Sequence, residues 1–320
     1  MKTLLLAKTA AILALYGACS LAQDYPARTV TLVAPFAAGS PTDSAARIIG
    51  ARLGERLKQA LIVENKPGAN AQIGAEYVAR AKPDGYTLFF ATSTSHSSNP
   101  SLFKTLRYDP VRDFTPIGRT VDLSYVLLVN PTLPAKTVRE LIDYARANPG
   151  KLSYATPNSP SMVVAETMRV MSNLSIVGVP YKSGPQALTD LISGQVQLYV
   201  ADLMSSVPAI RSGQARALGL STVQGSKLVP GLPALADTFP GLDIVSWGGI
   251  FGPADLPRPV VARLSAELQA VLAEKDVQER LIKIGFEVSP SKSPEEFARY
   301  VVDQLSIWSR LVKQAGIQPE

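Results

Sequence analysis

Four short loops rich in serine, threonine, glycine and proline carry the residues best suited to binding a small anion. Each loop follows an apolar segment predicted to be a strand and leads into a predicted helix; the loops cover residues 35–43, 92–98, 156–161 and 181–185. Backbone N–H groups at a helix start have no partner inside the helix, and the helix dipole places partial positive charge there. Small side chains leave those donors accessible. We therefore expect an anion site at the carboxyl ends of strands.

Residues that could support catalysis are sparse. His96 is the only histidine, and the sequence has no histidine pair at metal-binding spacing and no acidic cluster of the D-x-D-x-D type. It also lacks the nucleophile-elbow, dinucleotide and phosphate-loop motifs. We therefore predict a protein that is not an enzyme and that uses no metal or cofactor. One alternative stays open, a hydrolase with a Ser-His-Asp triad built on His96, although a single histidine in a polar loop is more often a hydrogen-bonding surface residue.

The elements that must position these loops form two α/β series. The first comprises strand 29–34, helix 41–59, strand 61–64, helix 69–81 and strand 86–91, and the second runs from strand 152–155 to strand 215–220. Such alternation predicts a mostly parallel sheet flanked by helices in each series. Extended stretches at 117–129 and 242–251 would connect the two. We expect two lobes joined by two crossings, with a cleft between them.

The lobe boundaries are predicted at these crossings. Residues 23–121 and 245–320 would form lobe 1, and residues 122–244 would form lobe 2. The C-terminal part includes a long helix from Pro294 to Ala315 and lacks a strand series sufficient for its own domain. We therefore expect it to return and complete lobe 1.

Residues 1–22 have the composition of a secretory signal peptide. Lys2 and Lys8 supply positive charge around an apolar run, and Ser20-Leu21-Ala22 provides small residues for cleavage after Ala22. Lipidation at Cys19 is the alternative, but the preceding residues lack the usual branched aliphatic side chain. Cys19 is the only cysteine. The mature chain would therefore have no disulfide, no zinc–thiolate site and no cysteine nucleophile.

The charge of the chain is mildly basic and dispersed. The net charge is +6, which falls to +4 when Lys2 and Lys8 leave with the signal peptide. Because lysine and arginine occur singly, the sequence gives no basic patch of the kind that binds nucleic acid. No stretch beyond the signal peptide approaches a bilayer-length apolar run, so we predict a soluble mature protein.

Several segments match one known family in order along the chain. They are Pro35 to Asp43 followed by Ala46-Arg47, Val63 to Ala69, Pro83 to Leu88, Tyr108 to Pro110 with Asp113-Phe114, Val179 to Lys182, Leu188 to Leu191 with Gly194 to Val196, Arg216 to Leu218, and Pro294 to Phe297. On these residues the chain resembles the substrate-binding proteins of the tripartite tricarboxylate transporter system, the Bug or TctC family.

The resemblance implies an α/β fold of the two-lobed, type II-like periplasmic binding protein class. Such a protein closes on a small carboxylate, here a di- or tricarboxylate, an acidic amino acid or an aromatic acid, held by loop backbone groups and bridging waters from both lobes. It also implies a monomer in the periplasm whose partners are the integral-membrane subunits of the transporter. A sensor subunit that docks on a receptor kinase is the alternative.

Candidate ligand-binding residues follow from the loops together with the resemblance. They are Phe36, Ala38, Gly39, Ser40, Thr42, Asp43, Ser93, Ser95, His96, Thr156, Ser159, Ser161, Tyr181 and Asp202. Structural roles compete with binding at several of them. Asp43 could instead be the capping partner of Ser40, and Asp202 could instead cap a helix that begins near Ser205. Phe36 could be a core aromatic residue, and Tyr181 a half-buried structural one.

Overall fold

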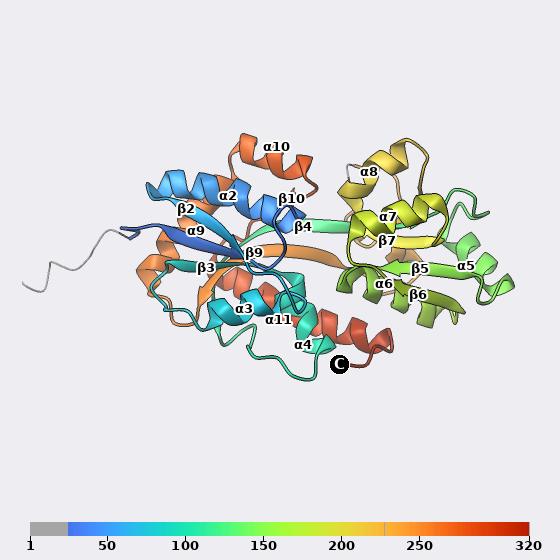
Figure 1. Ribbon diagram of the computed structural model, residues 1–320, viewed down its shortest axis with the longest axis horizontal. Coiled ribbons are helices and arrows are strands. Elements are labelled where there is room, and N and C mark those ends of the chain that lie inside the picture. The colour runs from blue at the N-terminus through green and yellow to red at the C-terminus, as the bar shows by residue number, and fades with distance from the viewer. Residues whose placement is uncertain (1–24, 227, 320) are drawn as a thin grey trace, which may run out of the picture.

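The chain forms two lobes connected by long strands (Figure 1). The computed structural model describes residues 25–226 and 228–319. The predicted signal peptide, including Cys19 and the cleavage site, lies outside these residues. Within the described part of the chain, no helix combines the length and the apolar character needed to cross a membrane.

Lobe 1 is a sheet covered by helices on both faces. Its elements are β1 (Val30–Ala34), α2 (Pro41–Leu57), β2 (Leu61–Asn65), α3 (Gln72–Ala79), β3 (Thr87–Thr92), a π-helical turn (Thr94–Ser98), α4 (Asn99–Leu102), α9 (Arg258–Leu272), α10 (Lys275–Lys283), β10 (Glu287–Val288) and α11 (Pro294–Gln314). Leu32 and Leu88 pack under α2, α9 and α10, whereas Val33 and Phe89 pack with α3 and α11. This alternation follows from the two-residue period of a strand.

Lobe 2 repeats the same layered plan. Its elements are α5 (Val138–Ala147), β5 (Leu152–Thr156), α6 (Ser159–Met171), β6 (Ile176–Pro180), α7 (Gly184–Ser193), β7 (Leu198–Asp202), α8 (Leu203–Arg211), β8 (Arg216–Leu220) and a short 3₁₀ turn (Leu235–Asp237). Leu198 and Val200 face α5 and α6. Tyr199 and Ala201 face α7 and α8. The predicted two-lobed α/β fold is therefore confirmed.

Two antiparallel strands cross between the lobes. β4 (Phe114–Val129) pairs with β9 (Val245–Pro253) from Phe114–Pro253 to Ser124–Val245, and β4 then continues between β7 and β8. Ser221, just after β8, joins both crossings: the Tyr125 N–H donates to its Oγ at 3.0 Å, and its hydroxyl donates to the Ile244 carbonyl at 2.7 Å. The Ser221 hydroxyl therefore ties the two crossings together at the edge of lobe 2.

The terminal helix α11 spans both lobes (Figure 1). With a rise of about 1.5 Å per residue, its 21 residues extend roughly 30 Å. Phe297 and Val301 pack in the aromatic core of lobe 1, whereas Trp308, Leu311 and Val312 pack with α5 and α6 of lobe 2. The predicted boundaries place all of this helix in lobe 1, but its last turns belong to the packing of the other lobe.

The predicted helix 69–81 begins later than expected. Ala69, Asn70 and Ala71 have φ values of 45°, 53° and 71°, and the helix starts only at Gln72. Left-handed backbone is unfavourable for alanine, so tertiary contacts must hold this segment. Capping motifs of the S/T-x-x-D/E type start two other helices, because Ser40 accepts from the Asp43 N–H before α2 and Thr137 from the Glu140 N–H before α5.

Replacing Trp308 with alanine should destabilise the protein by about 3–5 kcal/mol, because the change empties a large fully buried site in lobe 2. Urea unfolding followed by circular dichroism measures the effect. Val302→Ala is the matched control, since Val302 lies on the same helix and is 49% exposed. A loss no larger for Trp308→Ala than for Val302→Ala would contradict the proposed bridging role of α11.

Candidate functional site

A chain of hydroxyl groups connects the lobes at the crossings. The Oγ atoms of Ser93, after β3, and Ser246, on β9, are 2.6 Å apart. Tyr125 on β4 lies near enough to Ser246 for that hydroxyl to affect its pKa, and it is the cross-strand partner of Asp202 at the end of β7. Burial and then the Asp202 carboxylate raise the pKa of Tyr125 well above its usual value, so it stays a neutral hydroxyl. The fold thus brings the predicted residues Ser93 and Asp202 close together.

Tyr125 and Ser246 are not among the candidate residues from the sequence. Both lie inside the extended stretches that the sequence indicates only as connections between the lobes. A tyrosine and a serine in otherwise apolar crossing strands were the available signal, but their proximity depends on the β4–β9 register, which places Ser124 opposite Val245.

Asp202 occupies the N-cap position of α8 but does not cap it. Its side chain makes no capping hydrogen bond, while its carbonyl accepts from the Ser205 and Ser206 hydroxyls at 3.0 and 2.8 Å. A Cβ at Gly184, the first residue of α7, would lie 3.0 Å from Tyr199 Oη and 3.8 Å from Asp202 Oδ2. The carboxylate therefore lies beside the starts of two helices. Burial raises its pKa to about 6.

Asp43 organises the loop between β1 and α2. Its Oδ2 accepts from the Gly39 N–H at 2.9 Å, and its Oδ1 accepts from Asn65 Nδ2 at 2.8 Å. Arg47 donates to the same carboxylate, and these hydrogen bonds and this charge outweigh burial and lower the pKa of Asp43. All its acceptor positions serve the protein, so Asp43 holds the loop in place, in line with the capping alternative.

The same loop leaves backbone donors free. The amides of Ala38 and Thr42 have no acceptor among the described residues, and Phe36, Ala38, Ser40 and Thr42 are exposed or partly exposed. Gly39 has φ +80°, a conformation that suits glycine. Figure 1 shows this start of α2 at the end of lobe 1 that faces lobe 2. The geometry thus matches the predicted anion-binding loop.

His96 is not a solvated loop residue, and that expectation is wrong. It is completely buried in the π-helical turn, with the Phe251 and Phe114 rings at centroid distances of 4.4 and 4.6 Å. Its Nδ1 lies 3.0 Å from Ser95 Oγ, and its Nε2 has no partner among the described residues. Burial lowers its pKa to about 3, so the ring is a neutral core group. A hydrolase would need an accessible base at this position, so the buried His96 gives the hydrolase alternative no support.

Several predicted lobe 2 side chains are engaged in holding that lobe together. Thr156 Oγ1 donates to the Val179 carbonyl, Ser161 Oγ donates to the Val200 carbonyl, and Tyr181 Oη donates to Asp190 Oδ2. Ser95 in lobe 1 is likewise bonded to the Thr92 backbone. Any ligand contact at these positions therefore falls to backbone groups or to atoms left over from internal bonds.

Ser159 makes a contact between the lobes. Asn70 Nδ2 donates to Ser159 Oγ at 3.1 Å and to Asn99 Oδ1 at 3.0 Å. Asn70 belongs to the left-handed segment before α3, whereas Ser159 is the first residue of α6. The strained segment thus places a polar side chain of lobe 1 against a helix start of lobe 2, as expected for a functional site.

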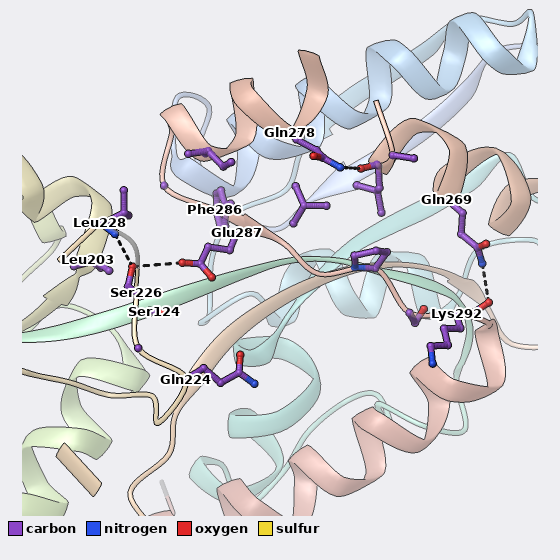
Figure 2. Close-up of a pocket in the computed structure, with 18 of the residues that line it drawn as sticks. Ser124, Leu203, Gln224, Ser226, Leu228, Gln269, Gln278, Phe286, Glu287 and Lys292 are labelled. Carbon is purple, nitrogen blue, oxygen red and sulfur yellow. Dashed lines mark hydrogen bonds between the residues drawn. The ribbon is translucent and has the colours of Figure 1, made fainter. Parts of the chain in front are cut away.

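A cavity of about 1080 Å³ lies beside the crossings (Figure 2). Leu203, Gln224, Ser226 and Leu228 of lobe 2 line one side, and residues between Gln269 and Lys292 of lobe 1 line the other. Ser226 Oγ and Glu287 Oε1 meet across it at 3.4 Å. Two of its three glutamine side chains are engaged, since Gln269 donates to the Lys292 carbonyl and Gln278 to the Leu272 carbonyl. Among its described lining residues none is a predicted site residue.

The described residues hold no group of three or more His, Cys, Asp or Glu side chains placed to bind a metal. The polar groups of the candidate site are hydroxyls, backbone amides and the Asp202 carboxylate. This set suits hydrogen bonding of a small polar anion with the help of water.

Comparisons with known proteins give a consistent result. The profile described as "Tripartite tricarboxylate transporter family receptor" matches residues 45–317. A UPF0065 protein of Bordetella bronchiseptica is 32% identical over 320 residues, covering 99% of this chain and 94% of its own. The structure of R. palustris Rpa4515 with adipate is 34% identical, with a TM-score of 0.83 over 92% of this chain and 100% of that one. MatC from Rhodopseudomonas palustris with bound malate is 33% identical, with a TM-score of 0.79 over 90% and 100%.

The buried neutral His96 should weaken the protein in acid. The unfolded chain takes up a proton on this residue below about pH 6.5, whereas the folded protein does so only near pH 3, so unfolding becomes easier as the pH falls. The cost is about 1.4 kcal/mol of folding stability per pH unit within that window.

The variant His96→Phe tests this, because it keeps an aromatic ring and removes the titrating group. Between pH 7 and pH 4 the variant should lose about 3 kcal/mol less stability than the wild type in urea unfolding. Equal losses would show that His96 is not a buried neutral group.

Proposed function

The chain belongs to the tripartite tricarboxylate transporter receptor family, and we propose that it captures a small carboxylate between its lobes and delivers it to a membrane transporter of that type. Members of this family are binding proteins rather than enzymes. The adipate and malate found with two solved relatives support the carboxylate class. The exact acid and its delivery to a membrane partner are the proposed part.

The observation that carries this proposal is that each lobe presents polar groups near the crossing strands. Lobe 1 contributes Ser93 and the free amides at the start of α2, and lobe 2 contributes Asp202 and the start of α6 at Ser159. We propose that amides and bridging waters hold a carboxylate there, because helix starts bind anions without a buried arginine.

Ligand binding would then favour closure. A ligand that touches both lobes gains all its contacts only when the lobes are together, so it shifts the population toward the closed arrangement. The Asn70–Ser159 hydrogen bond supports this view, since it exists only while the two lobes are in contact. The closed face would be the form that the membrane subunits recognise. The proposed periplasmic location rests on the family and on the predicted signal peptide at residues 1–22.

Gly39→Val should abolish carboxylate binding while leaving the fold intact. The left-handed backbone at Gly39 is strained for valine, and the amide network around Asp43 would rearrange. Thermal unfolding with adipate, malate, citrate, glutamate and benzoate measures binding: an acid at a hundred times its dissociation constant adds about 2.7 kcal/mol to wild-type stability. The variant should lose at least ten-fold in affinity.

Gly150→Val is the matched control for this variant. Gly150 also has positive φ, 74°, with open space around its Cβ position, but it precedes β5 at the end remote from Thr156. The control should lose similar stability and keep the ligand-induced shift. Loss of the shift in both variants, or in neither, would place the site away from the 35–43 loop, and no stabilisation of the wild type by any acid would contradict the proposed function.

Delivery to a transporter predicts that cells lacking this protein lose uptake of the acid identified in that screen. Uptake of the radiolabelled acid should return when the wild-type gene is supplied and stay absent with Gly39→Val. Normal uptake together with a lost transcriptional response to the acid would instead favour the sensor alternative.

A further inference from the structure

We propose that Asp202 makes the cleft selective for carboxylates that carry a hydrogen-bond donor, a hydroxyl or an ammonium group, over unsubstituted acids. This inference rests on the proposed function and concerns the same cleft. It goes beyond that function because it names the chemical feature, apart from the carboxylate, that the ligand must present.

Asp202 is an acceptor without a donor. Its side chain makes no capping hydrogen bond, and among the described residues no hydrogen-bonding or charged partner contributes to its pKa, which burial alone raises. The capping role that would have explained it is absent, because the Ser205 and Ser206 hydroxyls bond to its carbonyl and not to its carboxylate. An ionised carboxylate accepts up to four hydrogen bonds, and one that is partly buried is costly to leave unpaired.

The surroundings of Asp202 contain no compensating positive charge. The titratable groups that face it are the hydroxyls of Tyr125 on β4 and Tyr199 on β7, and burial together with the Asp202 charge keeps both of them neutral. The start of α7 at Gly184 contributes backbone only. Burial alone raises the pKa of Asp202 to about 6, which fits a carboxylate whose partner is missing.

The position of Asp202 lets a bound molecule supply that partner. Asp202 ends β7 directly opposite Tyr125 on the crossing strand, and the Ser246–Ser93 hydroxyl pair continues from Tyr125 into lobe 1. Asp202 thus lies on the lobe 2 side of the crossings and Ser93 on the lobe 1 side, and we propose that a ligand held by lobe 1 presents its remaining groups to Asp202. Tyr125 and Tyr199 hydroxyl oxygens are additional acceptors beside it, so an O–H or N–H group finds several partners there.

Unsubstituted acids lack what this environment requires. A second carboxylate or a methylene chain would leave Asp202 unpaired, and a second carboxylate would also repel it. A site that hydrogen-bonds a ligand group strongly discriminates against analogues without that group, because its own polar atoms then remain buried and unsatisfied. Hydrogen bonds to a charged acceptor are among the stronger ones in proteins.

Calorimetric titration with succinate, malate and aspartate tests the proposal, because these acids share a four-carbon skeleton and differ by one hydrogen, hydroxyl or ammonium group. Glutarate, 2-hydroxyglutarate and glutamate form a second series one carbon longer. In at least one series the wild-type protein should bind a donor-bearing acid at least ten-fold more tightly than the unsubstituted one. Whether the hydroxy acid or the amino acid binds more tightly shows whether the preferred donor is a hydroxyl or an ammonium group.

Asp202→Asn should reduce that preference at least ten-fold, with weaker binding of the donor-bearing acid and stronger binding of succinate or glutarate. Asp276→Asn, a change at an exposed carboxylate of α10, should leave the preference unchanged.

If Asp202→Asn does not fold, Asp202→Ser serves the same purpose. Equal or tighter binding of unsubstituted acids by the wild type, or an unchanged preference in the Asp202 variants, overturns the role of Asp202 while the proposed function stands. Failure of every acid in both series to bind overturns both.

Discussion

The antiparallel pairing of β4 with β9 is the interaction on which the rest of the structure depends. These two strands are interior members of the lobe 1 sheet, and β4 continues as an interior member of the lobe 2 sheet. Separating the lobes would break a ladder that runs through both cores. Near Tyr125 the two crossings are also joined by the Ser221 hydroxyl. The polar groups of the candidate site lie at this same place.

Burial explains why so few of the polar side chains in the loops remain available to a ligand. Buried hydroxyls and carboxylates must find partners within the protein. Asp43, Ser95, Thr156 and Ser161 find theirs in nearby backbone. Backbone amides at helix starts and the carboxylate of Asp202 are the groups left over. A neutral, amide-based site with one carboxylate acceptor is thus a consequence of how the loops are held.

Predictions from the sequence succeeded where the signal was local. The N-caps at Ser40 and Thr137 depend on residues three apart, and the alternation of strands with helices depends on short-range periodicity. The interpretation of 92–98 failed because its serines and histidine look polar in sequence, yet the segment is covered by the aromatic side chains of β3, β4 and β9. The sequence also does not predict the late start of α3, because only the surrounding fold holds Ala69 and Ala71 in left-handed backbone.

By itself the sequence determined the α/β class, the two lobes, the loop that begins α2 and, through its resemblance, the family. Those features depend on hydrophobic period, capping chemistry and motif order, which are properties of neighbouring residues. Only the tertiary structure decided that His96 is core, that α11 belongs to both lobes, and that Tyr125, Ser246 and Ser93 connect to Asp202. Strand register and helix packing set those relations, because they join residues that lie far apart in the sequence.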